Sequence, residues 1–241
     1  MNNYRLTIQY DGTDYAGWQI QENAKTIQGI ISESIKTILR EEINLIGSGR
    51  TDSGVHSIGQ VANFRCENKI DVYSFQHSIN AVLPEDISVI RIEEVDELFN
   101  SRFDAKQRTY LYLFSKIKSP FYYKYSVYKK NLDIKSFKEL STNFLGKKDF
   151  SSFCKKKSDI ENKVCEVKQV TWRETNNFYL FFISSDRFLH GMVRAIIGTI
   201  LKAVNKKEGN DYIKKIIDDK SREAAGDSVP AKGLFLYRVD Y

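Results

Sequence analysis

Apolar and polar residues alternate with a period of two at the start of the chain. Residues 3–10 place Tyr4, Leu6, Ile8 and Tyr10 on one side, which predicts a half-buried strand. Helical spacing follows, with apolar residues at Ile27, Ile30, Ile31, Ile35, Ile38 and Leu39. A glycine-rich stretch, "GSGRTDSGVHSIGQVANF", covers residues 47–64, and its end at 60–64 is typical of a short strand. The first quarter therefore predicts a strand, a helix, a loop and a second strand.

The next elements follow the same two periods. A helix is predicted from an N-cap at Asp71 to a stop at Pro84. Strands are predicted over 87–95 and 107–115. In the second of these strands Arg108, Tyr110, Tyr112 and Phe114 share one face, and we expect that face to meet a ligand.

The second half repeats this alternation. We predict a helix over 133–145 that ends at Gly146, strands over 164–173 and 178–184, and a final strand at 233–241. A long helix carries an apolar stripe made of Val193, Ile196, Ile197, Ile200, Leu201 and Val204. Residues 155–163, "KKKSDIENK", are expected to form a loop. The fold class is α+β, with two similar subdomains, 1–104 and 105–241, that share a mostly antiparallel mixed sheet with helices packed on it.

Composition is that of an ordinary globular protein. The chain has 241 residues, of which 41% are hydrophobic, enough to bury a core. It has no run of about 18 apolar residues and no signal-peptide pattern at its start, so we expect a cytoplasmic protein without a membrane span. Three cysteines lack C-x-x-C spacing and three histidines lie far apart, so we expect reduced thiols and no local metal site.

Charge divides the chain. Residues 1–105 hold 9 Lys and Arg against 16 Asp and Glu, and residues 106–241 hold 28 against 15. From residue 106 to 132 there are seven basic residues and no acid, interleaved with tyrosine and phenylalanine. Basic groups neutralise phosphates and rings stack on unpaired bases, so this segment fits an RNA-binding surface. A solvated lysine-rich face over core tyrosines explains the same composition, although the charge asymmetry favours nucleic acid.

The glycine loop fits none of the common nucleotide motifs. Gly49 and Gly54 have P-loop spacing, but Val55 and His56 stand where Lys and a hydroxyl are needed. A glycosidase would need a second carboxylate beside Asp52. Flexible glycines can project Asp52 into a cleft, where a nearby guanidinium would keep it ionised for nucleophilic or base chemistry. A local turn tied by the Asp52 side chain is the alternative, and spacing does not decide between the two.

Six ordered blocks resemble the tRNA pseudouridine synthase A family. "GRTDSGVHSIGQVANF" is similar to its G-R-T-D-x-G-V-H signature, and "YDGTDYAGWQIQ" to its opening block. The others are "NAVLPEDI", "FDAKQRTYLYLF", "FLHGMVRAIIG" and "AGDSVPAKGLFLYRVDY", so the resemblance covers nearly the whole chain. The sequence departs from the family pattern at Ile20, Lys148 and Val229, and the departures at Ile20 and Lys148 bear on the exact RNA contacts.

The resemblance implies a role for each of five residues. Asp52 matches the catalytic aspartate, Tyr110 the ring that stacks on the target base, and Arg194 the arginine that pairs with the aspartate across a central active-site cleft. Arg50 and His56 match loop residues that help to hold flipped RNA. A base must leave its stack before it can be reworked, so its catalyst has to protrude into a pocket.

The implied function is an isomerase that converts uridine to pseudouridine in the anticodon stem-loop of tRNA, at positions 38, 39 and 40. The family needs no cofactor or metal, and a homodimer is expected, with tRNA as the partner. A paralogue that acts on another RNA site, a catalytically silent RNA-binding protein and a base- or sugar-processing hydrolase are the alternatives. Release of free uracil would indicate the hydrolase, and loss of tritium from C5-labelled uridine without base release would indicate the isomerase.

Overall fold

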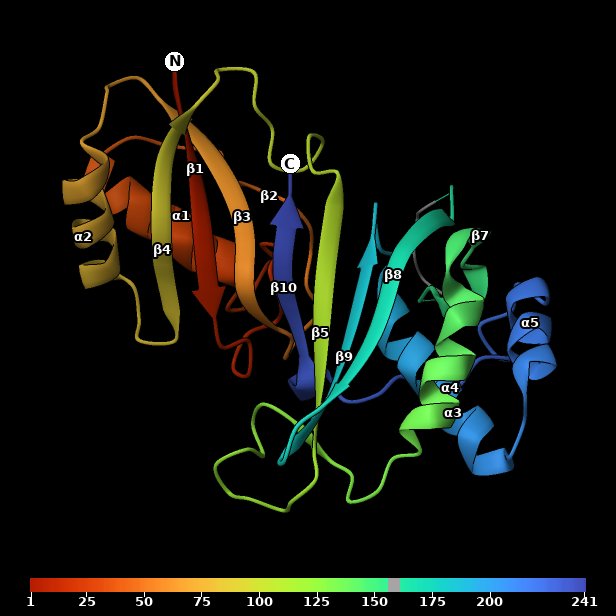
Figure 1. Ribbon diagram of the computed structural model, residues 1–241. Coiled ribbons are helices and arrows are strands. Elements are labelled where there is room, and N and C mark those ends of the chain that lie inside the picture. Colours follow the sequence, from red (N-terminus) through yellow and green to blue (C-terminus); the bar gives the residue numbers. More distant parts are fainter. Residues whose placement is uncertain (156–160) are drawn as a thin grey trace. The chain divides into compact units, whose positions relative to one another are not determined.

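A computed structural model describes residues 1–155 and 161–241. The chain forms two compact units, the first made of residues 1–106 and 235–241 and the second of residues 107–234. Figure 1 shows both in the colours of the sequence. The division predicted from sequence, 1–104 and 105–241, placed the last strand in the second half. That strand packs in the first unit because it pairs with a strand there.

The strands of the first unit follow the order β4-β1-β3-β10. β1 (Asn2–Tyr10) is antiparallel to both β3 (His56–Cys66) and β4 (Ile87–Val95), whereas β10 (Leu234–Asp240) is parallel to β3. The short β2 (Ile46–Gly47) also pairs with β3. β3 is longer than the strand predicted at 60–64, because it already begins at His56, directly after the glycine loop.

Two helices cover the apolar face of these strands. α1 (Ile27–Leu39) is capped by Thr26, whose hydroxyl accepts a hydrogen bond from the Gly29 amide at 3.3 Å. α2 (Val72–Val82) has Asp71 as its N-cap, as predicted, and the Asp71 carboxylate accepts from the Ser74 amide at 2.8 Å. The core joins residues of the sheet and both helices: Tyr4, Leu6, Ile8, Phe64, Ile27, Ile31, Ile35, Phe75 and Ile79. The alternation read from residues 3–10 is confirmed by the burial of its four apolar side chains.

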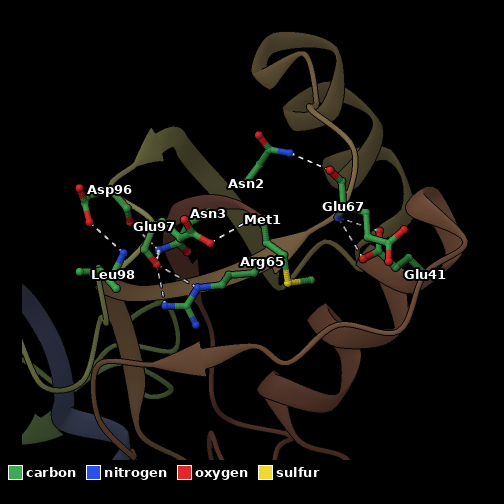
Figure 2. A network of polar contacts seen from close by, with 9 residues as sticks. All are labelled: Met1, Asn2, Asn3, Glu41, Arg65, Glu67, Asp96, Glu97 and Leu98. Carbon is green, nitrogen blue, oxygen red and sulfur yellow. Dashed lines mark hydrogen bonds and ion pairs between the residues drawn. The ribbon is translucent and has the colours of Figure 1, made fainter.

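A polar network closes one end of the first unit (Figure 2). Asn3 at the start of β1 donates to the carbonyl oxygens of Asp96 and Phe99, each at 2.9 Å. Arg65 near the end of β3 donates twice to the Glu97 carbonyl, at 3.0 and 2.8 Å. Backbone groups that leave the sheet here find partners, so the ends of β1, β3 and β4 stay together away from the glycine loop.

The second unit has a strand order β5-β9-β8-β7 and neighbouring strands are antiparallel. Its strands are β5 (Gln107–Ser115), β7 (Gly146–Asp149), β8 (Val164–Glu174) and β9 (Phe178–Ser185). The short β6 (Val127–Tyr128) runs parallel to β5. Both units are therefore α+β with mostly antiparallel strands, as the sequence predicts.

Three α-helices complete the described part of this unit: α3 (Ile134–Ser141), α4 (Met192–Lys206) and α5 (Asn210–Asp218). α3 is shorter than predicted, because the chain tightens into a 3₁₀ turn at Thr142–Phe144. Trp172 of β8 packs edge-on against Phe137 of α3 and donates its indole N–H to the Ser141 hydroxyl at 2.8 Å. β7 and α5 were not predicted. Part of the expected loop at 155–163 lies outside the described residues.

Candidate active site

Asp52 stands in the loop between β2 and β3. A tight turn from Asp52 to Val55 is closed by the Val55 amide, which donates to the Asp52 carbonyl at 3.1 Å. Gly54 has φ of +74°, a conformation that side-chain-bearing residues rarely adopt. The Asp52 side chain itself is half-buried, between the buried Thr51 and the exposed Ser53.

Buried aromatic residues fix the backbone on both sides of Asp52. The Trp18 amide donates to the Thr51 carbonyl at 3.1 Å, and the Tyr10 and Thr51 hydroxyls are 2.9 Å apart. On the other side, the Ser53 hydroxyl donates to the Tyr15 carbonyl at 3.0 Å. The three aromatic side chains are at most 4% exposed, so the loop is anchored in the core of the first unit.

Two glycines outside the predicted loop allow this anchoring. A Cβ on Gly17 would lie 2.5 Å from the Thr51 carbonyl oxygen, and one on Gly12 would lie 2.0 Å from the Val55 carbonyl oxygen. Gly17 also has φ of +101°. Gly49, one of the two loop glycines expected to adopt a conformation that other residues avoid, has no positive φ, and a Cβ on it would meet open space. The glycines that the loop requires are therefore Gly12 and Gly17, for close backbone approach, and Gly54, for its positive φ.

Arg50 is exposed two residues before Asp52. Its Nε donates to the Gln19 side-chain oxygen at 3.1 Å, and Gln19 in turn donates to Gln28 at 2.9 Å. The buried Gln28 continues to the Leu45 carbonyl at 2.8 Å. Two glutamine side chains thus hold the guanidinium of Arg50 through its Nε, while Arg50 remains exposed.

His56 has a different environment from the one the resemblance implied. Its side chain is 1% exposed and stacks on Phe235, with ring centroids 4.7 Å apart. Nδ1 lies 3.1 Å from the Gly12 amide and 3.0 Å from an Asp11 oxygen. A neutral ring accepts from Gly12, and a protonated ring donates to Asp11; both tie β3 to the segment after β1. A contact between this side chain and RNA does not fit its burial.

Tyr110 belongs to β5 in the second unit, opposite Ile183 of β9. Its ring is partly buried and meets Phe188 edge-on, with centroids 5.1 Å apart. Tyr112 and Phe114 share its face but are fully buried, which excludes a ligand there, whereas Arg108 and Tyr110 are partly exposed and their contact with a ligand stays a prediction. The later part of this face of β5 packs in the core of the second unit.

Arg194 lies in the first turn of α4. Its Nε donates to the Val229 carbonyl at 2.7 Å, and its own carbonyl accepts from the Val229 amide at 3.2 Å. The next residue, Pro230, accepts a hydrogen bond from the Tyr112 hydroxyl at 2.9 Å. Residues 229 and 230 thus connect the strand of Tyr110 with the helix of Arg194, a link that the sequence did not suggest.

Two electrostatic effects act on Tyr112. Burial raises the pKa of its hydroxyl above the usual range, and the positive charge of Arg194 lowers that pKa in part. The charge of Arg194 therefore acts on the Tyr112 hydroxyl, two residues along β5 from Tyr110.

Asp52, Arg50 and His56 thus belong to the first unit, and Tyr110 and Arg194 to the second. The expected pairing of Asp52 with Arg194 joins residues of different units and stays a prediction. Among the described residues, no group of three or more His, Cys, Asp or Glu side chains is placed to hold a metal ion. No helix within 1–155 or 161–241 has the length and apolar content needed to cross a membrane.

The sequence profile of one family, described as tRNA pseudouridine synthase, matches residues 6–104 and 140–241. The chain belongs to this family. It is 41% identical to tRNA pseudouridine synthase A 2 of Clostridium perfringens and 42% identical to tRNA pseudouridine synthase A of Caldicellulosiruptor saccharolyticus. Each alignment covers 100% of both chains. The resemblance stated from the six motif blocks is confirmed, and the protein is an enzyme of the isomerase class that acts in tRNA modification.

One solved structure, of an H/ACA RNP bound to a substrate RNA containing 2'-deoxyuridine, has a TM-score of 0.37 and 13% identity to this tRNA pseudouridine synthase family member. The alignment covers 82% of this chain and 42% of the other. A similarity at that level supports no further conclusion.

Proposed function

We propose that this protein converts uridine to pseudouridine in the anticodon stem-loop of tRNA, at positions 38, 39 and 40, with Asp52 as the catalytic residue and without a cofactor. The observation that carries the proposal is the setting of Asp52. Its two neighbours are tied to buried aromatic residues, and its own side chain is partly exposed. A carboxylate held in this way meets a substrate with little reorganisation.

The reaction rearranges one nucleoside. The bond from N1 of uracil to C1′ of the ribose breaks, the base turns, and a bond from C5 to C1′ replaces it. C5 then loses its proton and N1 gains one, so substrate and product have the same atoms. A carboxylate contributes by attack at C1′, by attack at the base, or by taking a proton from C2′. All three routes require Asp52 to reach a nucleoside that has left its stack.

The other residues take supporting roles in this proposal. The partly exposed ring of Tyr110 on β5 stacks on the flipped base. Arg194, which donates to the Val229 carbonyl, pairs with Asp52 and keeps the carboxylate ionised. The exposed Arg50 contacts RNA. The buried His56 does not contact RNA and stabilises the loop through its contact with the Gly12 amide. A homodimer in the cytoplasm, with tRNA as its partner, completes the proposal.

The substitution Asp52→Asn tests the catalytic role. It removes the charge and keeps the size, so we expect turnover to disappear while tRNA affinity stays within about tenfold, or about 1.4 kcal/mol. Tritium release from tRNA labelled at C5 of uridine measures turnover, and filter binding measures affinity.

Asp218→Asn is the matched control, because Asp218 is an exposed aspartate at the end of α5. We expect that variant to turn over like the unmodified enzyme. Substantial tritium release by pure Asp52→Asn protein would refute the role, and release of free uracil would indicate a hydrolase. Mapping pseudouridine in tRNA from cells with and without the protein tests positions 38, 39 and 40.

A further inference from the structure

A basic and aromatic loop follows β5 in the second unit. We call residues 116–130 the aromatic loop. Four of its rings are exposed to solvent: Phe121 is 84% exposed, Tyr123 58%, Tyr128 47% and Tyr125 41%. Full burial of one such side chain contributes about 1.5–3 kcal/mol, so a chain that leaves four of them exposed gains little folding energy from them. A cluster of exposed rings of this kind is typical of a binding surface.

The backbone of the loop is nevertheless well held. Tyr122 turns inward, and its ring packs against Phe178 with centroids 4.8 Å apart. The Tyr122 carbonyl accepts from the Tyr125 amide at 3.1 Å and from the Ser126 hydroxyl at 2.8 Å. β6 then pairs with β5 and returns the chain to the sheet. Phe121 and Tyr123, on either side of the anchor, therefore stand outward from a fixed turn.

Positive charge surrounds these rings. Lys118, Lys124, Lys129 and Lys130 are exposed, and Lys232 lies over the Tyr123 ring at 6.0 Å. Glu174 pairs with Lys116 of the loop at 2.6 Å. Lys116 also lies 4.7 Å from the centre of the Tyr179 ring. With Lys116 paired, the exposed lysines 118, 124, 129 and 130 and Lys232 still supply positive charge beside these rings.

We propose that the aromatic loop binds unpaired nucleotides of the RNA substrate, with Phe121 and Tyr123 stacked on bases and the lysines on phosphates. Rings bind exposed base faces, which a duplex hides, and lysines bind the phosphates that join them. A second copy meeting this surface with its own aromatic loop would bring like charges together, which is unfavourable. This proposal rests on the proposed function, because it supplies a binding surface for the same RNA.

The test separates rings from charges in the full-length enzyme. The variant F121S/Y123S removes two rings and keeps every lysine. We expect its Kd for tRNA to rise by about tenfold or more, with the slope of log K against log salt unchanged. The variant K124Q/K129Q keeps the rings, and we expect a slope shallower by about one to two, because two phosphate contacts are lost.

Each variant has a control elsewhere in the chain. Y73S removes the ring of a tyrosine that is 83% exposed on α2, in the acidic first unit, and we expect its Kd to stay unchanged. K214Q/K215Q removes two lysines of α5, which are exposed, and should leave the salt slope unchanged. Circular dichroism and light scattering check folding and oligomeric state in every case.

A second measurement needs no variant. Photo-crosslinking of unmodified enzyme to tRNA that contains 4-thiouridine should label the tryptic peptide Ser119–Lys124, which lies between two lysine cleavage sites. A ring variant with the Kd of the unmodified enzyme, no crosslink in that peptide, or a loss of dimer in place of RNA affinity would each overturn the proposal.

The outcome is distinguishable from failure of the proposed function. F121S/Y123S should keep its kcat at saturating tRNA, because it leaves Asp52 untouched. Asp52→Asn should lose turnover and keep RNA affinity. If only the second of these results fails, the catalytic assignment falls and the binding surface stands.

Discussion

Thr51 is the residue through which the core of the first unit positions Asp52. Its hydroxyl lies 2.9 Å from that of Tyr10, and its carbonyl accepts from Trp18. Thr51 and Tyr10 are both buried. Because the hydroxyl pair is shielded from water, its hydrogen bond contributes more to loop geometry than a surface contact would. Tyr10 is therefore a positioning residue for the proposed reaction.

The variant Tyr10→Phe tests this role. It removes one hydroxyl, so we expect a loss of about 1 kcal/mol in unfolding free energy and a fall in kcat of about tenfold, because Asp52 is less well held. KM should change little. Urea unfolding and tritium release measure the two effects.

Tyr4→Phe is the control on the same strand. Tyr4 is also buried, and its hydroxyl accepts from the Ile70 amide at 3.0 Å, away from the glycine loop. We expect Tyr4→Phe to lose a similar amount of stability and to keep its kcat. Equal kcat losses in both variants would show that Tyr10 acts only through stability.

At the scale of single residues, the sequence identified the loop but not which side chains face outward. Asp52 and Arg50 follow from the motif, whereas the burial of His56 depends on Phe235, which is 179 positions away in the chain. The same holds for Gly17, whose partner Thr51 becomes a neighbour only after folding. Long-range packing decides such roles, and local spacing does not carry that information.

At the scale of elements, α4 is positioned by a close backbone contact. A Cβ on Gly198 would lie 1.7 Å from the Asp227 carbonyl oxygen, and the Gly226 amide donates to the Thr199 hydroxyl at 2.8 Å. This contact brings residue 229 to Arg194, with which it exchanges two hydrogen bonds. The helix and the segment after it therefore set the place of the guanidinium together.

The variant Gly198→Ala should break this arrangement. Alanine favours a helix by about 1 kcal/mol, but the new methyl group meets a backbone oxygen that no rotamer change can move, and overpacking costs about 1–3 kcal/mol. Because 1.7 Å is far inside contact distance, we expect the clash to dominate, with a net loss of about 2 kcal/mol and reduced turnover. Urea unfolding and tritium release measure both.

Gly209→Ala is the control for this prediction. Gly209 precedes α5 with φ of −101°, and its Cβ would meet nothing within 4 Å. We expect unchanged stability and activity. A Gly198→Ala enzyme as stable as the Gly209→Ala enzyme would contradict the proposed close contact.

Elements with strong periodicity were predictable, and short ones were not. α1, α2, α4 and strands β1, β4, β5, β8 and β9 lie where the patterns predict them. β7 has four residues, and its sequence Gly-Lys-Lys-Asp shows no alternation of apolar and polar residues. Its pairing with β8 stabilises it, and that pairing cannot be inferred from the local sequence. β10 was predicted as a strand, but its partner β3 lies far away in sequence, so its unit could not be inferred.

At the scale of the whole molecule, buried ionisable groups make the free energy of unfolding depend on pH. Burial raises the pKa of Tyr10 and Tyr112 above the usual range, and burial raises the pKa of Cys165 to about 12. Each of these groups is neutral when protonated, so the folded protein keeps protons that the unfolded chain releases. Unfolded tyrosine ionises near pH 10 and unfolded cysteine near pH 8.5.

This difference predicts alkaline destabilisation. Above these unfolded pKa values the unfolded chain binds fewer protons than the native state, so the free energy of unfolding falls by about 1.4 kcal/mol per pH unit for each group. Stability should be nearly constant from about pH 7 to 8 and should fall steeply above about pH 10. Urea unfolding at pH 8, 9, 10 and 10.5 measures the slope.

The double variant Y10F/Y112F isolates the tyrosines. Phenylalanine cannot ionise, so the variant should be less stable at pH 8, where it lacks two hydrogen bonds, and should lose stability more slowly above pH 10. The two curves should therefore converge as pH rises. Parallel curves would mean that neither hydroxyl keeps its proton in the folded state. Burial would then not raise the pKa of Tyr10 or Tyr112.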